Sequence, residues 1–91
     1  MPPMNADKIK AFLSQGIEAE DIISGQLKID IVEAEQDYEE KSAIEQENGY
    51  SDAMESMERT YAEGFLDALS MVYRLTYDVS FARAELEKEN A

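Results

Sequence analysis

Carboxylates are the residues of this chain best suited to chemistry, and they crowd into its middle. Between positions 30 and 58 the sequence holds eleven acidic residues and a single basic one, Lys41. Such a density of like charge is self-repelling, and binding a cationic surface would offset the repulsion. We therefore expect an acidic surface that binds a basic partner. This surface, named the acidic belt, consists of Glu33, Glu35, Asp37, Glu39, Glu40 and Glu47.

The acidic belt has two interpretations, and the sequence leaves both open. Carboxylates on neighbouring turns of a helix lie roughly 5 to 6 Å apart, a spacing of the same order as that of phosphates along a nucleic-acid strand. The belt would then imitate a nucleic acid and occupy the basic site of a protein. In the other interpretation it is a solvated face that only keeps the chain in solution.

The composition argues against several classes of site. The 91 residues carry a formal net charge of -13 and include no cysteine and no histidine. Nucleic acids and anionic membranes would repel this surface, and the residues needed for disulfides, zinc sites and Ser-His catalysis are missing. No apolar run reaches the roughly 20 residues that span a bilayer. We expect a single-domain cytoplasmic protein without a cofactor, a metal site or catalytic residues.

Carboxylates without histidine can still hold magnesium, and two pairs have helical spacing: Glu55 with Glu58, and Glu63 with Asp67. The segment 63–75 resembles the metal-binding helix of the all-α nucleoside triphosphate pyrophosphatases of the MazG type. This resemblance implies a magnesium-dependent hydrolase. The family pairs an ExxE helix with a following ExxD helix. Here the spacing of Glu63 and Asp67 is wrong for the second motif, and the acids upstream give no clean ExxE: Glu33, Glu35, Asp37 and Glu40. The enzyme is therefore the third interpretation, and we expect no catalysis.

A second resemblance is one of type. The acidic belt and the compact segment 58–69 resemble the small, acidic, cysteine-free helical proteins with which bacteriophages disable host enzymes, some of which are DNA mimics. The resemblance implies an inhibitor that acts in the host cytoplasm on a basic or nucleic-acid-binding host protein. The alternative function is a structural coiled-coil adaptor, an oligomerisation module that relies on apolar contacts.

Helices are expected to position all of these residues, because the only prolines are Pro2 and Pro3. A short first helix is predicted over about 5–15. Asn5 is its expected N-cap, and Gly16 is its expected C-terminal stop.

A second helix is predicted over about 18–48, with its acids mostly opposite an apolar stripe. The stripe consists of Ile23, Leu27, Ile31, Ala34 and Tyr38. Residues 27–32 also alternate as a strand would, and Gly25 is either a break or a point of close packing. Beyond Tyr38 polar residues such as Glu45 replace the stripe. This end is expected to project into solvent or to meet another molecule.

A third helix is predicted over about 52–88, after a turn at Asn48 and Gly49 and with Ser51 as its cap. Apolar residues recur along it at steps of three and four, which is a seam of the coiled-coil type. The seam consists of Met54, Met57, Tyr61, Phe65, Ala68, Val72, Leu75, Val79, Ala82 and Leu86. A second apolar row runs beside it and consists of Ala62, Leu66, Leu69, Tyr73 and Tyr77.

The two rows together form an apolar arc wider than one partner helix can cover. The predicted fold is therefore all-α: an αα-hairpin of two long helices, plus the short first helix, that pairs into a dimeric four-helix bundle. Cover by the first helix is the competing arrangement. The expected dimer interface consists of Tyr61, Phe65, Leu66, Leu69, Val72 and Tyr73.

Overall fold

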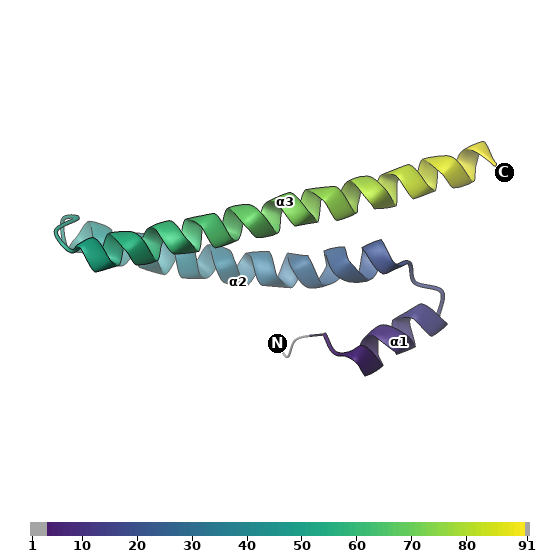
Figure 1. The fold of residues 1–91 in the computed structure, drawn as a ribbon, viewed down its shortest axis with the longest axis horizontal. Helices are drawn as coiled ribbons and strands as arrows, with labels where there is room; N and C mark the ends of the chain where they lie inside the picture. The colour runs from purple at the N-terminus through teal and green to yellow at the C-terminus, as the bar shows by residue number, and fades with distance from the viewer. Residues whose placement is uncertain (1–3, 91) are drawn as a thin grey trace. The chain divides into compact units, whose positions relative to one another are not determined.

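The computed structural model describes residues 4–90, which form three helices and no strand (Figure 1). Helix α1 spans Ala6–Ser14, α2 spans Ala19–Glu47 and α3 spans Ala53–Glu89. The all-α prediction is confirmed, and the strand interpretation of residues 27–32 is wrong because this segment lies inside α2. Within the described range, no helix combines the length and the apolar character that a membrane span requires.

The contacts within the chain divide it into two compact units. Unit 1 consists of Met1–Lys28 and Val72–Ala91, and unit 2 consists of Ile29–Met71. Unit 2 holds the second half of α2, the turn after it and the first half of α3. The acidic belt therefore belongs entirely to unit 2.

Both ends of α1 are capped as the sequence predicts. The Asn5 side chain accepts a hydrogen bond from the backbone N–H of Lys8 at 2.9 Å, which satisfies a free donor of the first turn. At the other end Gly16 has a φ of 85°, and the N–H of Ile17 bonds back to the carbonyl of Phe12 at 3.1 Å. This is the Schellman arrangement, in which glycine adopts the left-handed conformation without a steric penalty.

The turn between α2 and α3 repeats that arrangement. Gly49 has a φ of 65°, and the N–H of Tyr50 bonds to the carbonyl of Glu45 at 3.0 Å. The predicted cap of the next helix, Ser51, is wrong. Asp52 takes this role, because its carboxylate accepts the N–H of Met54 at 2.9 Å and its charge lies at the positive end of α3.

The core of unit 2 is built on small residues. Ala34 of α2 and Ala62 of α3 are its buried apolar side chains, at 5% and 3% exposure. Alanine keeps the side chain short, so two antiparallel helices can approach closely where it lies between them. Half-buried apolar residues extend this core: Ile31, Tyr38, Leu66 and Leu69.

In unit 1 the predicted stripe is correct at Leu27 and wrong at Ile23, whose place is taken by Ile22. Ile22 and Leu27 are buried, whereas Ile23 is 46% exposed. Helix α2 also continues through Gly25 without a break, and no atom outside the local backbone lies within 4 Å of the place where a Cβ would stand. Both expectations for Gly25 are therefore wrong for the described chain.

Candidate functional site

The acidic belt lies in two rows along α2. Every one of its six side chains is exposed. Steps of four, three and seven residues place the members of the first row on one side of the helix, and these are Glu33, Asp37, Glu40 and Glu47. Glu35 and Glu39 form the second row, about 200° and 240° around the helix from Glu33. A flat surface can contact one row fully but not both.

A different acid of α2 is withdrawn from this surface. The carboxylate of Glu45 is 3% exposed and receives a hydrogen bond from the Nε of Arg59 at 2.8 Å. The same guanidinium binds Glu63 through Nη1 at 2.9 Å. The expectation that this end of α2 projects into solvent is therefore wrong at Glu45. Arg59, fourteen residues further on, supplies a partner that the periodicity of α2 alone cannot reveal.

The environment of Glu45 holds it in the charged form. Hydrogen bonds from the Ser56 hydroxyl and from Arg59 lower the pKa of the Glu45 carboxyl from its ordinary value of 4.5, against the opposing effect of burial. Glu45 in turn raises the pKa of Arg59, so the pair remains ionised. This pair joins α2 to α3 by charge and hydrogen bonds where the apolar stripe has ended.

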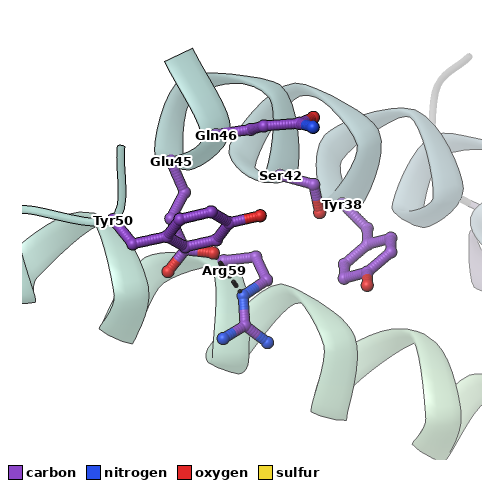
Figure 2. A pocket seen from close by; sticks show the side chains of 6 residues that line it. All are labelled: Tyr38, Ser42, Glu45, Gln46, Tyr50 and Arg59. Atoms are coloured by element: carbon purple, nitrogen blue, oxygen red, sulfur yellow. Dashed lines mark hydrogen bonds and ion pairs between the residues drawn. The ribbon is translucent and has the colours of Figure 1, made fainter. Parts of the chain in front are cut away.

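A hollow of about 320 Å³ opens beside this ion pair (Figure 2). Its lining comes from α2, the turn and α3, and consists of Tyr38, Ser42, Glu45, Gln46, Tyr50 and Arg59. Tyr50 has a φ of 61°, which is uncommon for a residue with a Cβ, and is 64% exposed. The hollow therefore has a polar floor and a tyrosine at its rim, but its arginine is already bound by two carboxylates.

The pKa shift of Glu45 predicts how acid affects stability. Because the folded-state pKa is lowered, the folded chain binds fewer protons than the unfolded chain, and this contribution to stability is lost as the pH falls from 4.5 through the folded pKa. We expect Glu45→Gln to lower the Tm at pH 7 and to flatten the loss of Tm below pH 4.5. Glu47→Gln, at an exposed position on the same helix, is the control that should do neither. Parallel acid profiles for the parent and Glu45→Gln would contradict this prediction.

Unit 1 contains a second arginine cluster. The Arg83 guanidinium binds the carboxylate of Glu20, which is buried, and also lies 3.6 Å from Glu18. The hydroxyl of Ser80 donates to Asp21 at 2.7 Å. The hydrogen bond from Arg83 lowers the pKa of Glu20 below its ordinary value. Glu20 and Asp21 therefore join α2 to α3 within unit 1, and Glu18, just before α2, lies beside the same arginine.

In each of the two carboxylate pairs considered for magnesium, one acid binds another side chain and the other acid is exposed. Asn48 donates to Glu55 at 2.7 Å, and Arg59 binds Glu63, while Glu58 and Asp67 are exposed. Among residues 4–90 there is no group of three or more acids arranged to hold a metal ion.

The expected dimer interface falls on two sides of α3. Tyr61, Phe65 and Val72 are exposed, at 77%, 50% and 47%. Leu66, Leu69 and Tyr73 are half-buried. The coiled-coil seam follows the exposed side. The second apolar row is withdrawn from solvent from Ala62 to Tyr73, whereas its last member, Tyr77, is 58% exposed.

Comparison of the chain with protein-family models, with curated proteins and with solved structures finds no match.

Proposed function

We propose that this chain is a non-enzymatic binding protein whose acidic belt occupies and blocks the basic site of a nucleic-acid-binding protein. One contrast carries the proposal. Arg59 is bound by Glu45 and Glu63, whereas all six carboxylates of the belt are exposed on α2, and there Lys41 pairs with Asp37 at 3.3 Å. The carboxylates of the belt are therefore accessible for contact with a partner.

The first row of the belt is the stronger candidate for contact. It holds four acids on one side of α2, and its neighbours along the helix lie one or two turns apart. A row of this kind presents successive negative charges to a groove that normally binds a phosphate backbone. Attraction between opposite charges would speed the encounter and would weaken as salt is added.

Charge reversal tests the belt. We expect Asp37→Lys, Glu40→Lys and Glu47→Lys together to weaken binding of the basic partner at least about tenfold at low salt and to flatten its salt dependence. The matched control reverses three exposed acids of unit 1, Glu85→Lys, Glu87→Lys and Glu89→Lys, and reaches the same net charge. The measurement is retention of proteins from a host lysate at graded salt, followed by titration of the purified prey.

Two outcomes of this comparison would end the proposal. If the belt variant binds the purified prey as well as the parent does, the belt is a solvated face. If the control weakens binding as much as the belt variant does, net charge rather than the belt is recognised. Duplex DNA should also displace the chain from the prey, since both are proposed to occupy one site.

The second candidate is a structural adaptor, and the exposed apolar side of α3 favours it. Tyr61, Met57 and Met54 are each more than 60% exposed on this side of unit 2. Contacts through such residues are apolar and tolerate salt, so an adaptor predicts preys that remain bound as ionic strength rises.

A further inference from the structure

An uncharged row runs along the exposed side of α3 in unit 2. Its members recur at steps of four and three residues, as in a helix that packs against another helix. The row, named the outer row, consists of Met57, Tyr61, Gly64, Ala68 and Met71. Its three large side chains are 67%, 77% and 68% exposed, and Phe65, half exposed, flanks it.

Gly64 is the informative member of this row. Glycine is unfavourable inside a helix relative to alanine, and apart from the local backbone no atom of the described residues lies within 4 Å of the place where a Cβ of residue 64 would stand. Packing inside the described chain therefore gives no reason for a glycine here. Close approach of another backbone would give one. Gly25, the other glycine inside a long helix, differs because Asp21 and Lys28 lie a turn away on its own side.

We infer that the outer row is the contact surface for a second copy of this chain, with the two α3 helices antiparallel. A two-fold axis between Gly64 and Phe65 sets Tyr61 of one copy opposite Ala68 of the other. The same axis sets Gly64 opposite Phe65. Each of these two rings then meets a small residue, so the middle of the surface is complementary to itself, as the interface of a two-fold dimer must be. At the ends of the row the same axis sets Met57 opposite Val72 and Met71 opposite Glu58.

Charge selects both the surface and the direction. Two chains of net charge -13 repel each other, and the outer row lets them meet through a line that carries no acid. Glu58 lies beside this line and is exposed. In the antiparallel pair the two Glu58 carboxylates are on the order of 20 Å apart along the helix axis, beyond the roughly 10 Å over which salt screens charges. A parallel pair would set them side by side.

This inference is independent of the acidic belt, and it differs from the interface expected from the sequence. Leu66 and Leu69, which were expected at that interface, are half-buried within unit 2 and do not belong to the outer row. The chain alone also buries little: its buried apolar residues in unit 2 are Ala34 and Ala62. Covering Tyr61 and Met71 would add the apolar burial that this thin core lacks.

Two glycine substitutions test the surface. Gly64→Leu favours the helix and fills the space of the close approach, so we expect its helical signal in circular dichroism to be undiminished and its dimer Kd to rise at least about tenfold. Gly25→Leu makes the same change at an open helical position outside the row, and its dimer should be unaffected. Mass is measured by sedimentation equilibrium over the micromolar range. A monomeric parent, or an unchanged Kd for Gly64→Leu, overturns the inference.

Cysteine substitution tests the direction, because the chain has no cysteine of its own. Gly64→Cys places the two thiols beside the two-fold axis, so mild oxidation should link the copies covalently. Met57→Cys places its thiols on the order of 20 Å apart along the axis in the antiparallel pair, and it should not form a link. Covalent dimers of both variants would show a parallel pair and overturn the antiparallel arrangement. If Gly64→Cys forms no covalent dimer, the arrangement is also wrong.

Discussion

Replacing Ala34 with aspartate is expected to destabilise the chain by about 3 kcal/mol, because a charge without a partner would enter the contact between α2 and α3 in unit 2. Ala34 is 5% exposed, and Asp30 lies one turn before it on the same helix, so the new carboxylate also meets a like charge. A chain of this length has a total stability of roughly 5 to 14 kcal/mol. The expected loss corresponds to a fall in Tm of roughly 12 to 24 °C.

Ala43→Asp is the matched control for this prediction. Ala43 is exposed on the same helix and in the same unit, so the substitution adds the same charge without burying it. Thermal unfolding followed by circular dichroism, at one protein concentration, measures both variants. Equal losses for the two would mean that Ala34 is not part of a packed core, and that α2 presents another side to α3.

The ends of the helices were predictable because their signals are local. Asn5 and Gly16 act through backbone groups within five residues of themselves, so the nearby sequence is enough to predict their capping role. The same holds for Gly49. At Ser51 the local signals were ambiguous, since Ser51 and Asp52 are both good caps. Asp52, directly before the first residue of α3, is the one whose carboxylate accepts the N–H of Met54.

The sequence could not decide which apolar row of α3 packs within the chain. Two apolar rows run side by side along α3. Helical periodicity gives the position of each row around the helix, but it does not identify what packs against either row. The row around Ala62, Leu66 and Leu69 is the one withdrawn from solvent in unit 2, whereas the longer and more apolar seam is exposed. A small residue at position 62 permits close approach. Total hydrophobicity therefore does not account for the choice.

The acidic side of α2 was predictable in part. Exposure of the belt follows from its positions off the apolar stripe, but its division into two rows appears only when the residues are placed around the helix. Glu45 was not predictable as a buried residue. Its partner Arg59 follows the turn, and only a chain folded back on itself brings the two together.

Removing the guanidinium of Arg59 is expected to cost more stability than removing that of Arg74, an exposed arginine of the same helix. Arg59→Met would leave the carboxylate of Glu45, 3% exposed, without the group that neutralises it, and would also release Glu63. A buried charge that loses its partner retains the cost of its own desolvation. The control is Arg74→Met, an identical change at an exposed arginine of the same helix, whose Tm should stay close to that of the parent.

A double variant separates the ion pair from simple loss of packing. If the cost of Arg59→Met comes from the charge left on Glu45, then Glu45→Met in the same chain removes that charge and should restore part of the lost Tm, although it removes a second native side chain. An apolar pair of similar volume can replace an ion pair with little loss. If the double variant is instead less stable than Arg59→Met by the full effect of Glu45→Met alone, the two residues act independently and the proposed coupling between α2 and α3 at this point is wrong.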